Sequence, residues 1–324
     1  MLLLRVGSLL LLLAGPSQAD LLIDIGGRTV NVHEPPGYDP GVPAPVVVLL
    51  HGYTSSGAGQ EAYMQFEPLS DEKGFLYLHP NGTVDCLGDR FWNGTDACCD
   101  LCGSGVDDVA FLTAVLDEVQ TSFNVDPTRI YLIGHSNGGF MSYRMACDRS
   151  NRIAAIASLA GATFDDPADC TPSAPVHTLQ IHGTLDDTIL YAGGTIGPVP
   201  YPGAVETAET WASTNGCSTV PDLSAPPLDL EANLPGAEST VARYETGCAG
   251  ASSELWTIVD GGHVPALSST FSREVVDWLL AHPKAASPSA LPTTSAGWLI
   301  AALASVGALV AVSGARRAAR RGSR

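Results

Sequence analysis

Short apolar runs recur along the middle of the chain, and each ends in a loop signal of Gly, His or Pro. They are rich in β-branched residues, and continuous apolar runs of this length are typical of strands that helices cover on both faces. The runs are VVVLLHG from Val46, FLYLHP from Phe75, RIYLIGHS from Arg129, RIAAIASLAG from Arg152, VHTLQIHG from Val176 and ELWTIVDGGH from Glu254. We expect these segments to form strands of one sheet.

Helical patterns alternate with several of these runs. Apolar residues between Val109 and Phe123 share one helix face behind Asp107, and an acidic residue favours a helix N-terminus. A second helix is predicted from Phe271, and residues 23–40 predict an antiparallel edge hairpin. Alternating strands and helices over this length predict an α/β fold with a doubly wound, mostly parallel sheet and helices on both faces. In such sheets, ligands bind at the carboxyl ends of the strands.

The two ends of the chain show different patterns. Residues 1–19 hold one arginine, an apolar run and then small residues, which predicts a secretory signal peptide cut before Asp20, with a buried helix as the alternative. Residues 285–295 are rich in Pro, Ser and Thr and predict a linker. Residues 296–315 are apolar or small over the length that crosses a bilayer, and residues 316–324 form a basic tail. By the positive-inside rule, this pattern predicts a membrane anchor with the body of the chain outside the cell.

The segment LPTTS just before the predicted span also resembles a cell-wall sorting signal, in which the chain is cut after the threonine and joined to the wall. The resemblance is incomplete because Ser295 occupies the position where glycine is expected. Sorting or proteolytic release is therefore the alternative to a retained anchor.

The body of the chain between these ends is strongly acidic. All 34 acidic residues but only 10 of the 16 basic residues lie in residues 20–284, which gives a formal charge of −24. A surface of this sign repels phosphate backbones, so nucleic acid is not expected as a partner. The charge favours a neutral or cationic substrate, and the length suits a single catalytic domain over residues 20–284.

All eight cysteines fall in this body, and an even number in an exported protein favours four disulfides. The segment CCDLC could instead bind zinc, but no second thiol pair or histidine lies at ligand spacing, so neither a metal nor a cofactor is predicted. The expected pairs are Cys147 with Cys170, Cys217 with Cys248, and Cys86 with a cysteine of the cluster at residues 98–102.

The segment YLIGHSNGGFMSYR, which begins at Tyr131, carries the candidate nucleophile. Ser136 directly follows a predicted strand, and GGFMSYRMACD continues as a predicted helix. A nucleophile on such a turn adopts strained backbone angles and needs small neighbours, which Gly134 and Gly138 supply. This context favours an attacking serine over one that lies between glycines by chance.

A serine hydroxyl needs a general base, and eight histidines compete for the role. His263 alone follows the last predicted strand, behind two flexible glycines in VDGGHVPAL, and we assign it as the base. The others are expected to pack, to shape loops or to cap a helix, and they are His33, His51, His79, His135, His177, His182 and His282.

The base in turn needs a carboxylate that fixes its tautomer and stabilises its imidazolium. The segment IHGTLDDTILY places Asp186 and Asp187 just beyond a strand, and the order Ser, Asp, His along the chain is that of α/β-hydrolases. Asp260 is a more distant candidate. Spacing alone leaves the choice between the two adjacent aspartates open.

Two N–H groups must face the oxyanion that forms during acyl transfer. We expect one from the backbone of Asn137, directly after the nucleophile, and one from the backbone of Tyr53, in the loop LLHGYTSSG. An ordinary glycine turn is the alternative interpretation of that loop. Trp92, in FWNG, is a candidate for the wall of the substrate cleft, with burial in the core as the alternative.

Taken together and in order, these segments are similar to the exported polyhydroxybutyrate depolymerase and feruloyl esterase group of α/β-hydrolases. The resemblance implies the α/β-hydrolase fold and ester hydrolysis, and the family's His-Gly-Thr-x-Asp pattern places the acid on Asp186. The family's Gly-His-x-Trp-Pro arrangement is here His263-Val264-Pro265, so the wall of the acyl pocket differs. The similarity covers about residues 25–283 through PPGYDP, LLHGYTSSG, FWNGTDACC, VDDVAFLTAVLDEV, IYLIGHSNGGFMSYRMACD, RIAAIASLAG, IHGTLDDTILYAGG, WASTNGC and GGHVPAL.

The sequence therefore predicts a serine esterase held outside a cell, in which Ser136 attacks an ester carbonyl and His263 passes the proton to the leaving alcohol. Feruloyl, acetyl and short hydroxyalkanoate esters share this reaction. Depolymerases that act on solid polyester often carry a separate binding domain. None is visible in this sequence, which makes solid polyester a less favoured substrate. The alternatives are a serine peptidase, which would need a deeper leaving-group site, and a catalytically inert binding module, which would show a disabled triad.

Overall fold

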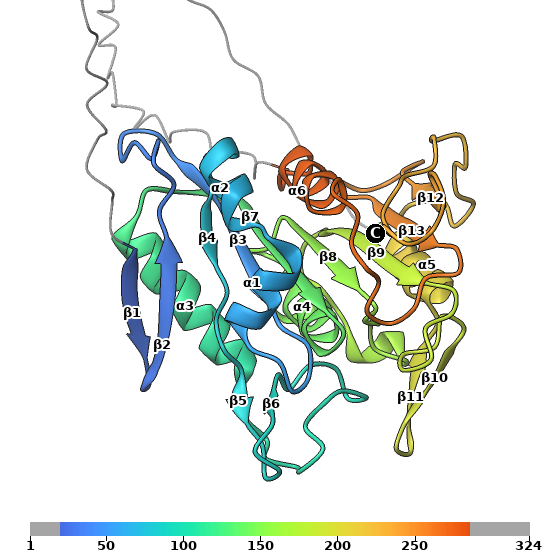
Figure 1. The fold of residues 1–324 in the computed structure, drawn as a ribbon, viewed down its shortest axis with the longest axis horizontal. Coiled ribbons are helices and arrows are strands. Elements are labelled where there is room, and N and C mark those ends of the chain that lie inside the picture. The colour runs from blue at the N-terminus through green and yellow to red at the C-terminus, as the bar shows by residue number, and fades with distance from the viewer. Residues whose placement is uncertain (1–19, 286–324) are drawn as a thin grey trace, which may run out of the picture. The chain divides into compact units, whose positions relative to one another are not determined.

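The computed structural model describes residues 20–285, and Figure 1 shows one sheet between two layers of helices. The nine strands follow the spatial order β1 (Leu21–Ile25), β2 (Arg28–His33), β4 (Leu76–Leu78), β3 (Ala44–Leu50), β7 (Val125–His135), β8 (Ala155–Leu159), β9 (His177–Gly183), β13 (Ser253–Ile258) and β12 (Ser239–Tyr244). Neighbouring strands from β4 to β13 run parallel, whereas β1, β2 and β12 pair antiparallel at the two edges. The doubly wound, mostly parallel sheet is confirmed.

The apolar runs that predicted strands all lie in this sheet, as β3, β4, β7, β8, β9 and β13. The edge hairpin predicted over residues 23–40 is formed by β1 and β2, which pair from Leu21 with Val32 to Ile25 with Arg28. Because the central strands run parallel, their carboxyl ends all lie at the same edge of the sheet. The loops that leave these strands therefore meet at one edge of the sheet.

Alternate residues of the central strands face the two helix layers. In β3, Val46 and Val48 pack in the core beneath α3, α4 and α5, whereas Val47 and Leu49 pack in the core beneath α1, α2 and α6. In Figure 1, α1, α2 and α6 lie in front of the sheet. The helices are α1 (Gly57–Met64), α2 (Glu67–Lys73), α3 (Asp108–Ser122), α4 (Asn137–Asp148), α5 (Ala204–Thr214) and α6 (Phe271–Ala281), with a 3-10 turn at Pro167–Asp169. The helices predicted behind Asp107 and from Phe271 are confirmed as α3 and α6.

Two small hairpins extend from the carboxyl edge of the sheet, at the bottom of Figure 1. They are β5 (Thr83–Val84) with β6 (Arg90–Phe91), and β10 (Gly193–Ile196) with β11 (Val199–Pro202). The loops after β3, β7, β9 and β13 leave the same edge, and they carry Tyr53, Ser136, Asp186 and His263. The fold thus gathers the candidate catalytic residues from four separate segments.

Four disulfides join the eight cysteines: Cys86 with Cys102, Cys98 with Cys99, Cys147 with Cys170, and Cys217 with Cys248. The two expected pairs at residues 147–170 and 217–248 are confirmed, and the cysteine at position 86 pairs within the predicted cluster. Disulfides in this number are typical of proteins from an oxidising compartment, such as the outside of a cell.

The predicted signal peptide (residues 1–19), all but the first residue of the predicted linker (residues 285–295), the predicted span (residues 296–315) and the basic tail (residues 316–324) lie outside residues 20–285. Within residues 20–285, the structure contains no helix that is long and apolar enough to cross a bilayer.

Candidate active site

Ser136 lies on a strained turn between β7 and α4. Its φ of 53° and ψ of −119° fall in a region that residues with a side chain rarely adopt. A Cβ atom at Gly134 would lie 2.1 Å from the carbonyl oxygen of Gly138, and a Cβ atom at Gly138 would lie 2.1 Å from the carbonyl oxygen of Leu50. The two glycines therefore let the backbones of the strand and the helix approach closely enough to hold the turn.

His263 and Asp186 form a row of side chains with Ser136. The Nε2 atom of His263 lies 3.0 Å from Oγ of Ser136, and its Nδ1 atom lies 2.8 Å from Oδ2 of Asp186. The adjacent Asp187 is exposed, and its carboxylate accepts a hydrogen bond of 3.3 Å from the hydroxyl of Thr188. The structure thus brings Asp186, and not Asp187, to the candidate base.

The Asp186 carboxylate is buried and held by several donors. Its Oδ1 atom accepts the backbone N–H groups of Thr188 at 2.9 Å and Ile189 at 2.8 Å. Burial alone would raise the pKa of this carboxyl, but hydrogen bonds from His182 and His263 outweigh burial and hold the pKa of Asp186 well below its ordinary value. The carboxylate is therefore charged at neutral pH and can stabilise an imidazolium.

Two backbone N–H groups lie beside the nucleophile. Asn137 is the first residue of α4, so its N–H has no acceptor within the helix. The loop after β3 runs against the nucleophile, because a Cβ atom at Gly52 would lie 3.6 Å from Cβ of Ser136. Within residues 20–285, the backbone N–H groups of Tyr53 and Asn137 donate to no backbone acceptor. Both groups are available to a ligand oxygen.

Trp92 contributes to this region through its backbone and not through its side chain. Its indole is fully buried and packs against His51 and Phe111, and it does not line the cavity beside Ser136. The prediction that Trp92 forms part of the cleft wall is therefore wrong, because its ring belongs to the core. The backbone N–H of Trp92 donates to Oδ1 of Asn137 at 2.7 Å, and its carbonyl accepts from Nδ2 at 2.8 Å. This clamp fastens the loop at residue 92 to the start of α4.

A cavity of about 360 Å³ opens beside the nucleophile and is lined by Gly52, Tyr53, Ser55, Gly59, Gln60, Tyr63, His135, Ser136, His263 and Val264. The Tyr63 hydroxyl donates to the Pro265 carbonyl at 2.6 Å, which ties α1 to the loop of the base.

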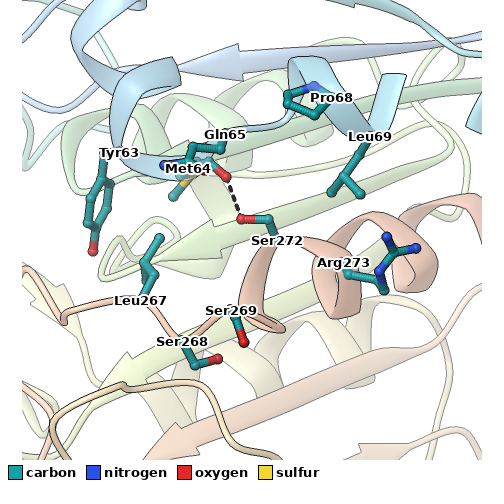
Figure 2. A pocket seen from close by; sticks show the side chains of 10 residues that line it. All are labelled: Tyr63, Met64, Gln65, Pro68, Leu69, Leu267, Ser268, Ser269, Ser272 and Arg273. Carbon is teal, nitrogen blue, oxygen red and sulfur yellow. Dashed lines mark hydrogen bonds between the residues drawn. The ribbon is translucent and has the colours of Figure 1, made fainter. Parts of the chain in front are cut away.

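Figure 2 shows a neighbouring cavity of about 410 Å³ between α1, α2 and α6, which shares only Tyr63 with the first and contains none of the candidate catalytic residues. No group of three or more His, Cys, Asp or Glu side chains in residues 20–285 could hold a metal ion.

Two buried histidines at the site predict a pH dependence of stability. Burial lowers the pKa of His51 and of His135 from 6.5 to about 4. Between these values the unfolded chain binds more protons than the folded chain, so the free energy of unfolding falls as the pH is lowered through this window and rises with pH. Between about pH 6.5 and pH 5, each histidine is expected to remove up to about 2 kcal/mol of stability.

The measurement is the Tm of the native chain and of a His135→Gln variant at several pH values between about 7.5 and 5. The variant is expected to be less stable at the upper end, because Nε2 of His135 makes a 2.9 Å hydrogen bond to the carbonyl oxygen of His263. The difference in Tm should shrink as the pH falls, because the variant lacks the group that titrates. A difference that stays constant over the range would contradict this account.

Comparison with known proteins places the chain among esterases. A family described as "Putative esterase" matches residues 26–232. Feruloyl esterase B of Piromyces equi is 31% identical over 247 residues, which cover 73% of this chain and 42% of that relative. Probable feruloyl esterase C of Aspergillus clavatus is 28% identical over 256 residues, which cover 76% of this chain and 80% of that relative. The chain thus spans less than half of the first relative and most of the second.

A solved structure gives the same fold. The acetyl xylan esterase from Aspergillus awamori superposes with a TM-score of 0.56 over 81% of this chain and 99% of that protein, at 17% sequence identity. Identity this low establishes only the shared architecture, which agrees with the strand order described above. The family match, in contrast, covers more than half of the chain. The chain therefore belongs to this esterase family and has the α/β-hydrolase fold.

Proposed function

We propose that this chain is an exported serine esterase in which Ser136, His263 and Asp186 form the catalytic triad and the backbone N–H groups of Tyr53 and Asn137 form the oxyanion hole. The proposal rests on the contacts of His263, whose Nε2 atom lies 3.0 Å from the Ser136 hydroxyl and whose Nδ1 atom lies 2.8 Å from the Asp186 carboxylate. Ser136 itself lies on the strained turn at the start of α4. The four disulfides support export.

Acylation follows from this geometry. Nε2 of His263 takes the proton of the Ser136 hydroxyl while Oγ attacks the ester carbonyl carbon. Negative charge develops on the carbonyl oxygen between the two N–H groups, and each such donor typically contributes about a hundredfold to a thousandfold in rate. Asp186 keeps the proton on Nδ1 and stabilises the imidazolium. His263 then gives the proton from Nε2 to the leaving alcohol, and the acyl group remains on Ser136.

Deacylation reverses these roles with water as the nucleophile. His263 takes a proton from the water, whose oxygen attacks the acyl carbon, and the oxyanion again lies between the two backbone N–H groups. When the intermediate collapses, the proton on Nε2 returns to Oγ of Ser136. The carboxylic acid leaves and the free serine is restored.

We infer that the acyl group is aromatic, as in feruloyl esters. The cavity beside Ser136 holds about 360 Å³, which suits one small ring system, and Tyr53 and Tyr63 line it. Aromatic walls favour an aromatic ligand through stacked or edge-to-face contacts. The similarity to relatives named feruloyl esterases B and C supports the same acyl class.

The test compares kcat/KM for p-nitrophenyl ferulate and p-nitrophenyl acetate, which share one leaving group, so that their ratio reports the acyl side alone. Ferulate is expected to be preferred by at least about tenfold, because burial of a ring contributes more than about 1.4 kcal/mol. A preference for acetate would contradict the aromatic acyl class. Absence of turnover on both esters, from protein shown to be folded, would contradict the esterase itself.

A further inference from the structure

A second histidine lies beside the acid of the proposed triad. His182, near the end of β9, is almost fully buried, and its Nε2 atom lies 3.2 Å from Oδ2 of Asp186. The same oxygen contacts Nδ1 of His263 at 2.8 Å. The sequence pattern predicted only a role for His182 in shaping a loop, so a contact with the acid was not expected.

Gln180 determines which nitrogen of His182 carries the proton. Its Nε2 group donates to the carbonyl of Gly161 at 2.7 Å, and its Oε1 atom accepts the hydroxyl of Tyr143 at 2.9 Å, so both contacts fix the orientation of the amide. The same Nε2 group lies 3.0 Å from Nδ1 of His182. Because Nδ1 accepts this hydrogen bond, the proton of neutral His182 lies on Nε2, toward the acid.

Two oxygens lie near this N–H group, and the carbonyl oxygen of Ile189 accepts its hydrogen bond. The Nε2 atom of His182 lies 2.7 Å from the carbonyl oxygen of Ile189, which is the shorter contact, and 3.2 Å from the carboxylate of Asp186. The backbone N–H of Ile189 donates to the other carboxylate oxygen at 2.8 Å. His182 therefore holds the acid through the loop backbone, and its N–H also lies against the carboxylate, in a buried setting where polar contacts are strong.

We propose that His182 is a positioning residue, which directs Asp186 toward His263 and, by sharing the negative charge of the carboxylate, weakens the attraction of that carboxylate for the imidazolium. This inference rests on the proposed triad. His182 itself neither gives nor takes a proton during turnover, because its two nitrogens are engaged by Gln180 and by the loop of the acid. Its effect is carried by Asp186 alone.

Other titratable groups around the acid and the base come from neighbouring segments. The His135 ring lies 5.1 Å from the His263 ring, and the Tyr191 ring lies 5.7 Å from the His182 ring. Among the described residues, only the two histidines at positions 182 and 263 contact the Asp186 carboxylate with a titratable side chain. The His135 ring, at the end of β7, in turn lies 5.7 Å from the Tyr63 ring on α1, and Asp187 and Asp260 lie in the loops after β9 and β13 that also carry the acid and the base.

The test is the pH profile of kcat/KM for a His182→Leu variant of the full chain on p-nitrophenyl butyrate. Without the second donor, the carboxylate attracts the imidazolium more strongly, so the base is expected to bind a proton at higher pH. The acid limb of the profile should move to higher pH by about 0.5 to 1 unit, and kcat should fall by about tenfold. A His182→Gln variant, which restores an N–H near the same place, should return the limb toward its native position.

A Tyr143→Phe variant is the matched control, because it removes one buried hydrogen bond of the same network while Gly161 still orients Gln180. Its acid limb is expected to stay in place even if its Tm falls. If His182→Leu does not fold, Gln180→Leu is expected to shift the limb in the same direction by a smaller amount. The proposal would be overturned if the acid limb of the pH profile stayed in place in folded His182→Leu or Gln180→Leu protein. An equal shift of this limb in the Tyr143→Phe control would overturn it as well. Undiminished activity of Ser136→Ala would instead overturn the triad itself.

Discussion

Replacing Ser136 with alanine is expected to lower kcat for ester hydrolysis by about 10⁵-fold to 10⁶-fold. The variant loses the atom that forms the acyl-enzyme, so only substrate binding and the two backbone N–H groups would remain to accelerate attack by water. Stability should change little, because among the described residues the hydroxyl makes a hydrogen bond only with His263, and the strained backbone of the turn is unaltered. The Tm is therefore expected to stay within a few degrees of the native value.

The measurement is the rate of p-nitrophenyl butyrate hydrolysis, with Ser55→Ala as the matched control. Ser55 lines the same cavity but makes no contact with His263 among the described residues, so this variant should keep most of the activity. Labelling by a fluorophosphonate should be lost in Ser136→Ala and retained in the control. A Ser136→Ala protein that still hydrolyses esters at more than about one hundredth of the native rate would exclude Ser136 as the nucleophile.

The central sheet was predictable from the sequence because its strands are covered on both faces. All seven residues of β3 are buried, so this strand is a continuous apolar run. The strand β12 (Ser239–Tyr244) was not predicted, because its sequence STVARY has alternating exposure at an edge and carries no continuous apolar signal. The helix α1 (Gly57–Met64) was missed as well, because it spans only eight residues and includes two glycines, which weaken helix propensity.

The candidate nucleophile and the candidate base stand out in the sequence because Ser136 and His263 each follow a strongly apolar strand and at least one glycine. The choice between Asp186 and Asp187 could not be made from spacing, since both follow β9. Only the conformation of the loop after this strand buries Asp186 and leaves Asp187 exposed. The clamp between Asn137 and Trp92 joins residues 45 positions apart, and no local pattern reveals such a contact. The role expected for Trp92 failed for the same reason, because burial of its ring depends on packing between distant segments.

Replacing Asp186 with asparagine is expected to lower kcat by about 10⁴-fold with little change in fold. An amide at this position no longer requires the proton of His263 to lie on Nδ1, so the imidazole can carry its proton on Nε2, which then cannot accept the serine proton. The imidazolium that forms during attack also loses its buried counter-charge. Both losses act on kcat, so KM should change much less.

Asp187→Asn is the matched control, because it makes the same chemical change one residue away. Asp187 is exposed and contacts only the hydroxyl of Thr188 among the described residues, so this variant should keep kcat within about threefold of the native value. Similar losses in both variants would mean that the loop conformation, and not the charge of Asp186, supports the base. A large loss confined to Asp187→Asn would reverse the assignment of the acid, and with it the basis for a role of His182.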